Sequence, residues 1–350
     1  MRAKVRVLVA DDSAFARKVL REVLQDADDL EVVGVARDGL DALEKIAELA
    51  PDVLTLDLVM PELDGVGVLR ALDARGEGTS PRVVVVTMTD ADSALGVAAL
   101  AAGAFDVVHK PTAIATERLY ELGEELRSKV RAAARAAPGR RRAAPPAPVR
   151  SIAPGAAASA EVLVIGASTG GPQAVARLLS SIPSAFPIPA AVVLHMPPGY
   201  TAALAARFDA DCALEILEAR EGLPLQPGRV VVARAGMHLK FVRDGEERRA
   251  KLDVFPLETP HRPSVDVLFA SAAEAWGARV LGVVLTGMGN DGVEGARAIR
   301  ERGGRVLTES ESSCVVYGMP RAVVEAKLSD GSAPIEAMTA LVLDRIYAAR

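Results

Sequence analysis

Cysteine and aromatic residues are scarce in this chain of 350 residues. The two cysteines, Cys212 and Cys314, are far apart and form no C-x-x-C pair, which excludes a disulfide framework and a cysteine-based zinc site and favours a reducing compartment. Aromatic residues make up only 3% of the chain, so Val, Leu, Ile and Ala must fill its cores. Such a composition suits parallel sheets that are covered by Ala-rich helices.

An excess of positive charge and long apolar runs are also missing. The net charge of −5 provides no general attraction for phosphate backbones, so we expect no nucleic-acid partner. No apolar run approaches the roughly 18 residues of a membrane span, and the run 5–10 is too short for a signal peptide. We therefore expect a cytoplasmic, monomeric protein that does not insert into membranes. At this length, with half of the residues hydrophobic, two domains are expected.

Short apolar runs alternate with amphipathic segments through residues 1–122, which predicts a doubly wound, flavodoxin-like α/β domain. Its expected strands cover residues 5–10, 31–36, 53–56, 83–86 and 106–108. The alternation returns in residues 160–350 and predicts a second, larger α/β domain with a parallel sheet. The strands expected there cover residues 162–165, 190–194, 230–233, 280–285 and 305–307.

Residues 123–159 separate the two expected domains. They comprise the end of a helix and then a stretch rich in Ala, Pro and Arg, which has too many prolines for a regular helix and too few large apolar residues for a core. We expect a partly extended linker. We interpret the run Arg140-Arg141-Arg142 as a solvated part of this linker in preference to a docking signal.

Polar side chains follow four of the five expected strands in the first domain: Asp11, Asp12, Asp57, Thr87 and Lys110. The carboxyl ends of parallel strands meet at one edge of a sheet, and three carboxylates about 5 Å apart would repel by roughly 3 kcal/mol per pair at an effective dielectric of 20. Each acid by itself could be an ordinary helix cap, but their joint placement favours a cation. We predict that Asp11, Asp12 and Asp57 bind Mg²⁺, and that Asp57 accepts a phosphoryl group beside Lys110.

These residues stand in segments that resemble the receiver domain of two-component response regulators. The segments are residues 9–13, 56–65, 86–87 and 103–111. The resemblance covers the N-terminal third of the chain and implies that a phosphohistidine kinase phosphorylates Asp57 and that Thr87 follows the phosphoryl group. Three residues before Lys110, where many receivers have an aromatic switch residue, this chain has Val107. Switching by an aromatic side chain is therefore not expected.

The second domain begins with an apolar strand that runs into a G-x-S-x-G turn, Gly166-Ala167-Ser168-Thr169-Gly170. Such a strand-to-helix turn exposes the serine hydroxyl, and the N–H groups of the helix start favour an anion beside it. Ser168 is therefore the candidate nucleophile of an acyl-transfer reaction. A Rossmann-type cradle for a dinucleotide or methyl donor would instead need an acid at the end of the next strand, where the chain has His195.

A serine nucleophile needs a base and a third group that orients the base. Of four histidines, His195 directly follows the strand 190–194 and is the preferred base, with His261 and His238 as alternatives. Asp291 follows the strand 280–285 and is the expected orienting carboxylate, although it could be only part of a turn. The chain order Ser, His, Asp disfavours the α/β-hydrolases, in which Asp precedes His.

Five segments of the second domain resemble the catalytic domain of the chemotaxis protein-glutamate methylesterases, the CheB family: residues 165–171, 195–201, 261–269, 285–292 and 313–320. The resemblance implies a Ser168–His195–Asp291 triad, with oxyanion donors from the backbone N–H of Thr169 and from the loop at Met288. It implies a hydrolase that needs no cofactor and that demethylates glutamate methyl esters, and deamidates glutamines, on methyl-accepting chemotaxis receptors.

The combination with a receiver implies regulation by a chemotaxis histidine kinase as phosphodonor. We expect the unphosphorylated receiver to pack over Ser168 and phosphorylation of Asp57 to open the site. The remaining alternative is a non-catalytic output or docking module, which labelling of Ser168 by a fluorophosphonate probe would exclude.

Overall fold

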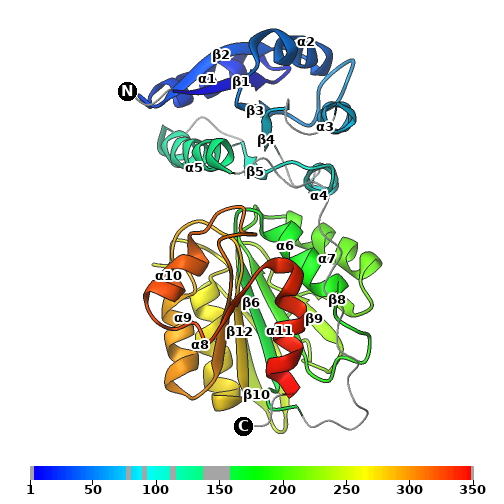
Figure 1. The fold of residues 1–350 in the computed structure, drawn as a ribbon, viewed down its shortest axis with the longest axis vertical. Coiled ribbons are helices and arrows are strands. Elements are labelled where there is room, and N and C mark those ends of the chain that lie inside the picture. The colour runs from blue at the N-terminus through cyan, green and yellow to red at the C-terminus, as the bar shows by residue number, and fades with distance from the viewer. Residues whose placement is uncertain (1–3, 76–79, 89–92, 111–115, 137–157, 348–350) are drawn as a thin grey trace. The chain divides into compact units, whose positions relative to one another are not determined.

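The computed structural model describes residues 4–75, 80–88, 93–110, 116–136 and 158–347, with only the backbone of residues 116–122. The chain divides into two compact units, residues 1–142 and 143–350 (Figure 1). Helix α5 continues across residue 122 to Arg135, and residues 137–157 of the predicted linker, including Arg140-Arg141-Arg142, lie outside the described residues. The boundaries 1–122, 123–159 and 160–350 therefore stay predictions.

The first unit contains one parallel sheet of five strands in the order β2-β1-β3-β4-β5. The strands are β1 (Val5–Ala10), β2 (Leu30–Ala36), β3 (Val53–Leu56), β4 (Arg82–Thr87) and β5 (Asp106–His109). Strands β1, β3 and β4 are apolar along most of their length because helices cover both faces of the sheet.

Five helices connect these strands: α1 (Ala14–Gln25), α2 (Gly39–Leu49), α3 (Gly65–Ala74), α4 (Ser93–Ala101) and α5 (Thr116–Arg135). Helices α1 and α5 pack against each other on one face, and α2, α3 and α4 form the layer on the other face (Figure 1). Side chains at the N-caps of α1, α2 and α3 accept backbone N–H bonds, which explains where these helices begin. The predicted doubly wound fold is confirmed.

The second unit has a parallel sheet of seven strands in the order β14-β13-β12-β6-β7-β9-β8. These strands are β6 (Val162–Ala167), β7 (Ala190–Leu194), β8 (Glu215–Glu218), β9 (Arg229–Val232), β12 (Val280–Val284), β13 (Arg305–Glu309) and β14 (Ser332–Ala333). A separate antiparallel hairpin consists of β10 (His238–Asp244) and β11 (Glu247–Asp253). The larger α/β domain with a parallel sheet is also confirmed.

Helices cover both faces of the second sheet (Figure 1). One layer contains α8 (Val265–Trp276), α9 (Val293–Glu301) and α10 (Met319–Glu325), and the other contains α6 (Gly171–Ser180), α7 (Tyr200–Asp211) and α11 (Ile335–Tyr347). A 3₁₀ turn, Gly277–Arg279, follows α8. Within the described part of the chain, every helix is too short or too polar to cross a membrane.

The sequence did not predict β8, β14 or the hairpin β10–β11. The edge strands β8 and β14 have four and two residues, too few for a clear apolar pattern. The hairpin carries several charged residues along both strands, and Gly245, with φ of +60°, stands in its tight turn. The strands β12, β6 and β7 in the middle of the seven-stranded sheet are the ones that position the candidate site.

Candidate functional site

Ser168 lies in the turn between β6 and α6. Its backbone N–H donates to the carbonyl of Thr286 at 3.0 Å, and its own carbonyl accepts from Gly171 N–H at 2.6 Å. Gly170 has φ of +76°, and a Cβ there would lie 2.6 Å from Val315 Cβ, so this turn requires glycine. The half-buried serine is thereby held at the carboxyl edge of the sheet.

The neighbouring strands bring two other loops to the same place. On one side β7 pairs with β6 so that Ala167 lies opposite Leu194, and His195 N–H donates to the Ala167 carbonyl at 3.3 Å. On the other side the loop after β12 passes directly over the serine, because a Cβ on Gly287 would lie 2.8 Å from Ser168 Cβ. The parallel topology therefore places Ser168 between His195 and the loop that leads to Asp291.

His195 and Asp291 form a hydrogen-bonded pair. His195 Nε2 lies 2.9 Å from Asp291 Oδ2, and each side chain is only 9% exposed. Because a carboxylate only accepts hydrogen bonds, Nε2 carries the proton and Nδ1 keeps its lone pair in the neutral ring. Nδ1 is buried and has no hydrogen-bond partner among the residues that the structure describes. This nitrogen is the one left to act as a base.

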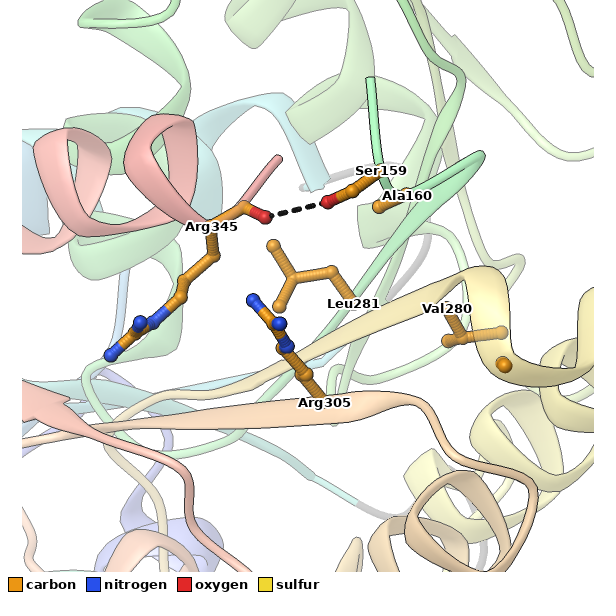
Figure 2. Close-up of a pocket in the computed structure, with 7 residues that line it drawn as sticks. Ser159, Ala160, Val280, Leu281, Arg305 and Arg345 are labelled. Carbon is orange, nitrogen blue, oxygen red and sulfur yellow. Dashed lines mark hydrogen bonds between the residues drawn. The ribbon is translucent and has the colours of Figure 1, made fainter. Parts of the chain in front are cut away.

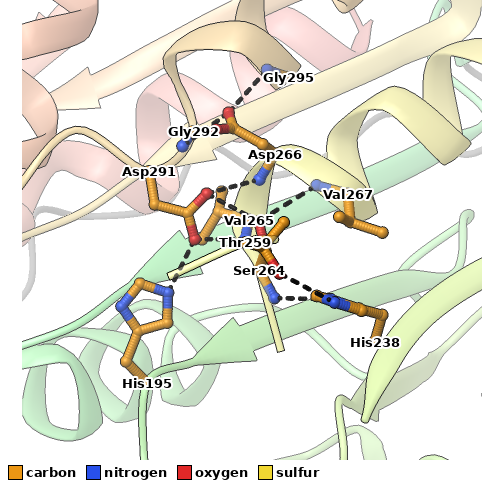
Figure 3. A network of polar contacts seen from close by, with 10 residues as sticks. All are labelled: His195, His238, Thr259, Ser264, Val265, Asp266, Val267, Asp291, Gly292 and Gly295. Atoms are coloured by element: carbon orange, nitrogen blue, oxygen red, sulfur yellow. Dashed lines mark hydrogen bonds and ion pairs between the residues drawn. The ribbon is translucent and has the colours of Figure 1, made fainter. Parts of the chain in front are cut away.

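Asp291 receives hydrogen bonds from the start of α8 as well as from His195 (Figure 3). Its carboxylate accepts from Ser264 Oγ at 2.9 Å, from Val265 N–H at 2.8 Å and from Asp266 N–H at 2.9 Å. Burial by itself would raise the pKa of Asp291, but the hydrogen bond and charge of His195, with the backbone N–H bonds, lower it well below its usual range. Asp291 is therefore held as a carboxylate that faces the imidazole.

The two alternative histidines have other surroundings. The ring of His261 stacks on that of His195, with centroids 4.0 Å apart and an angle of 22° between the planes. His238 is fully buried; its Nδ1 accepts from Ser264 N–H at 3.3 Å, and its Nε2 lies 3.1 Å from the Pro256 carbonyl. Burial lowers the pKa of His238. This histidine joins the loop before α8 to the start of that helix.

Three further residues hold the site together. Ser264 caps α8, and its hydroxyl also donates to Asp291. Asp266 lies in the first turn of α8, and its carboxylate accepts N–H bonds from the start of α9. Glu309, at the end of β13, is 1% exposed and accepts from Thr286 N–H at 2.8 Å. An acid two residues after the expected strand 305–307 was the available signal for Glu309. Asp266 lies in the segment 261–269, whose resemblance did not single it out.

The two predicted oxyanion donors lie in the turn at Ser168 and in the loop after β12. Thr169 is the residue after Ser168 and is 3% exposed, and its carbonyl accepts from Thr286 Oγ1 at 3.0 Å. Met288 lies in the loop that passes over Ser168, two residues after Thr286. The N–H of Ser168 itself is engaged by the Thr286 carbonyl. This N–H is therefore not available to another acceptor.

The first unit has an acidic pocket at the carboxyl edge of its sheet. Asp11, Asp12 and Asp57 each offer an oxygen atom, and these atoms lie within 4.8 Å of one another. Lys110 Nζ lies 2.7 Å from Asp57 Oδ2 and also pairs with Asp11. Burial raises the pKa of Asp57, Lys110 opposes this effect, and the charge of Asp11 adds to it. The three close carboxylates form an oxygen donor set typical of Mg²⁺ binding.

Thr87 is the fifth predicted residue of this pocket. It is fully buried, its carbonyl accepts from Lys110 N–H at 2.8 Å, and its hydroxyl has no partner among the described residues. Asp57, Thr87 and Lys110 thus stand at the ends of β3, β4 and β5, which are neighbours in the sheet.

A small, open pocket lies at the opposite, amino-terminal edge of the second sheet (Figure 2). Its lining contains no histidine and no carboxylate, and the hydroxyl of Ser159 donates to the carbonyls of Arg345 and Ile346 at 3.1 and 3.0 Å. Because parallel α/β folds use the carboxyl edge for catalysis, this pocket is not the candidate active site.

Comparisons with known proteins identify a family for each unit. The family model of the CheB methylesterase matches residues 163–342, and that of the response regulator receiver domain matches residues 7–121. The chain is 65% identical to protein-glutamate methylesterase/protein-glutamine glutaminase 5 of Myxococcus xanthus over 97% of each chain. It is 44% identical to the protein-glutamate methylesterase/protein-glutamine glutaminase of Symbiobacterium thermophilum, over 92% of this chain and 91% of the relative.

A solved structure resembles the second unit. The crystal structure of the Thermotoga maritima CheB methylesterase catalytic domain superposes with a TM-score of 0.52 and 36% identity, and the match covers 53% of this chain and 98% of that structure.

Proposed function

The chain belongs to the CheB family of protein-glutamate methylesterases/protein-glutamine glutaminases with a receiver domain, and on this premise we propose that Ser168, His195 and Asp291 carry out its hydrolysis. The observation that carries the proposal is the His195–Asp291 pair of 2.9 Å beside the turn that presents Ser168. A hydroxyl, an imidazole and a carboxylate at one sheet edge are the parts of a serine hydrolase.

In the first step Ser168 Oγ attacks the side-chain carbonyl carbon of the substrate and transfers its proton to His195 Nδ1. Asp291 stabilises the imidazolium that forms and keeps the proton of the neutral ring on Nε2. The tetrahedral intermediate then expels the leaving group, which takes the proton from Nδ1 and departs as methanol from an ester or ammonia from an amide. Water, activated by Nδ1, hydrolyses the acyl-enzyme to free glutamate and Ser168.

The negative oxygen of the tetrahedral intermediate forms beside the turn 168–170. We assign its stabilisation to the backbone N–H of Thr169 and to the loop at Met288. Each preorganised donor of this kind contributes about 3 to 4 kcal/mol to transition-state stabilisation. Glu309 supports the arrangement because it holds Thr286 N–H, at the base of that loop, at 2.8 Å.

The substrates we propose are glutamate methyl esters, and glutamines, on the cytoplasmic part of methyl-accepting chemotaxis receptors. The relatives bear names that specify both activities on protein side chains. Ester and amide share the same acyl group, so one triad serves both reactions, with methanol or ammonia as the leaving group.

We further propose that the receiver regulates this activity. A histidine kinase transfers a phosphoryl group to Asp57, with Asp11, Asp12 and Asp57 as the ligands that would hold Mg²⁺. When bound, Mg²⁺ supplies charge neutralisation for the phosphoryl oxygens. Lys110, 2.7 Å from Asp57, is placed to bind one of these oxygens, and the buried hydroxyl of Thr87 is a donor for another.

Replacement of the nucleophile tests the proposed catalysis. S168A should lower methanol release from a methylated chemotaxis receptor by on the order of 10⁶-fold, as the loss of a triad serine does elsewhere, and should abolish labelling by a fluorophosphonate. S180A is the matched control, because Ser180 donates to the Arg177 carbonyl on the surface of α6. Substantial methanol release by S168A would place the nucleophile elsewhere.

A further inference from the structure

Two aspartates connect the beginnings of helices α8 and α9 (Figure 3). Asp291, which precedes α9, binds the start of α8, and Asp266, which belongs to α8, binds the start of α9. Asp291 stands just before α9, and its carboxylate accepts the first N–H groups of α8, from Val265 and Asp266. Asp266 lies in the first turn of α8, and its Oδ1 accepts N–H bonds from Gly292 and Gly295 at the start of α9, each at 2.8 Å. The two carboxylates thus join the two helices reciprocally.

This exchange depends on a close approach of α8 and α9. Gly295 lacks a Cβ, and a Cβ there would lie 2.5 Å from Phe269 Cβ and 2.9 Å from Asp266 Cα. The approach brings the Asp266 carboxylate within hydrogen-bond distance of backbone N–H groups on α9. Phe269 is fully buried, so the contact belongs to the core and leaves the helices little freedom to move apart.

Asp266 consequently constrains Asp291 twice. Its backbone N–H binds Asp291 Oδ1 at 2.9 Å, and its side chain binds the N–H of Gly292, the residue that follows Asp291. Helix α8 does not need this carboxylate as a cap, because Ser264 Oγ already accepts Val267 N–H. The Asp266 side chain is directed instead to the backbone that carries Asp291.

We propose that Asp266 is a positioning residue, which holds the Asp291 carboxylate in line with His195 Nε2. The inference rests on the proposed function for the part that Asp291 plays in catalysis. A displacement of catalytic groups by about 1 Å is enough to lower a rate about 100-fold, so loss of one of the two constraints is expected to act on kcat.

Full-length D266A and D266N test this role. D266A should lower kcat for methanol release from a methylated receptor about 10- to 100-fold and leave KM within twofold. D266N keeps an oxygen that accepts the two N–H bonds and should retain kcat within about fivefold. A downfield ¹H NMR signal from His195 Nε2–H, assigned by its loss in H195A, should shift or broaden in D266A and persist in D266N.

The control is D330A, in the same unit. Asp330 accepts Val306 N–H at 2.8 Å near the beginning of β13, at the other edge of the sheet, and pairs with Arg300. Its loss should lower stability but leave kcat and the imidazole signal unchanged. A kcat of folded D266A within twofold of wild type, or an equal loss in D330A, would overturn the proposal.

If D266A does not fold, D266E takes its place. This variant keeps the charge but moves the carboxylate by one methylene, and it should lower kcat by at least tenfold; a kcat within twofold of wild type would again contradict the proposal. The NMR signal reports the His195–Asp291 pair without reference to Ser168. A failure of Ser168 as nucleophile would therefore be seen in S168A and not in this signal.

Discussion

Two neighbouring aspartates at the active site have opposite electrostatic behaviour. Hydrogen bonds from His195 and from backbone N–H groups outweigh burial at Asp291 and lower its pKa. Asp266 has fewer donors, so burial, with the charge of Asp291, raises its pKa to about 6 despite its bonds from Gly295 and Gly292. Asp291 is therefore kept ionised, whereas ionisation of Asp266 is disfavoured by the negative charge of Asp291 beside it.

This difference predicts a pH dependence of stability. The pKa of Asp266 rises from 3.8 to about 6 on folding, so between these values the folded state binds more protons than the unfolded state, and stability falls as pH rises. D266N removes the titrating carboxyl group and with it this loss of stability at higher pH. Relative to wild type, its free energy of unfolding should therefore increase as pH rises from 4 to 7, so the variant becomes the more stable of the two.

Urea unfolding followed by the fluorescence of Trp276, the single tryptophan of the chain, measures the second unit selectively. A wild-type minus D266N difference that stays constant between pH 4 and pH 7 would show that Asp266 titrates normally.

At the scale of the elements, each functional group stands at the end of a parallel strand or the start of a helix. Ser168, His195 and the loop to Asp291 follow β6, β7 and β12, which are adjacent in the sheet. The helices then fix these positions more closely. The Asp291 carboxylate binds the start of α8, and the Asp266 carboxylate binds the start of α9. The alignment of the catalytic pair thus depends on how closely two helices pack.

Gly295→Ala tests this dependence. The new Cβ would meet Phe269 Cβ and the backbone of Asp266 at 2.5 to 3.0 Å, and such overpacking costs roughly 1 to 3 kcal/mol. The gain in helix propensity offsets at most about 1 kcal/mol of this cost. We expect a net loss of stability of about 1 to 2 kcal/mol in urea, together with a lower kcat.

G331A is the matched control, because its Cβ would have only ordinary contacts at 3.6 Å and beyond. It should be neutral, or slightly stabilising through the unfolded state. Equal stability of G295A and G331A would mean that α8 and α9 can separate without cost.

At the scale of the whole molecule, the chain combines two units that each have a complete sheet and a core of their own. The acidic pocket belongs to the first unit and the proposed triad to the second. Regulation then requires only that phosphorylation of Asp57 changes the ratio of active to inactive molecules. Each factor of ten in this ratio corresponds to a free-energy change of about 1.4 kcal/mol.

The prediction is that a small-molecule phosphodonor with Mg²⁺ raises methanol release by wild type about tenfold or more and has no effect on D57N. Asp57 pairs with Lys110 in the unphosphorylated pocket, so D57N also removes this ion pair. D52N is the control, because Asp52 accepts Arg6 N–H outside the pocket and should leave the response intact. An equal response of wild type and D57N to the phosphodonor would contradict regulation through this residue.

Much of this organisation follows from local patterns in the chain. Alternating apolar and amphipathic segments identify two parallel α/β domains, and the rule that parallel strands end at one edge brings Ser168 and His195, or Asp11 and Asp57, together without coordinates. These inferences succeed because strand periodicity and strand-end turns are encoded over a few consecutive residues.

Only the folded structure reveals that Nε2 of His195 binds Asp291, that His261 stacks on the His195 ring, and that the Asp266 carboxylate binds Gly292 N–H. Asp266 and Gly292 are 26 positions apart and meet because two helices pack closely at Gly295. The orientation of a ring and hydrogen bonds between distant residues depend on three-dimensional packing. No local or periodic pattern in the sequence predicts such contacts.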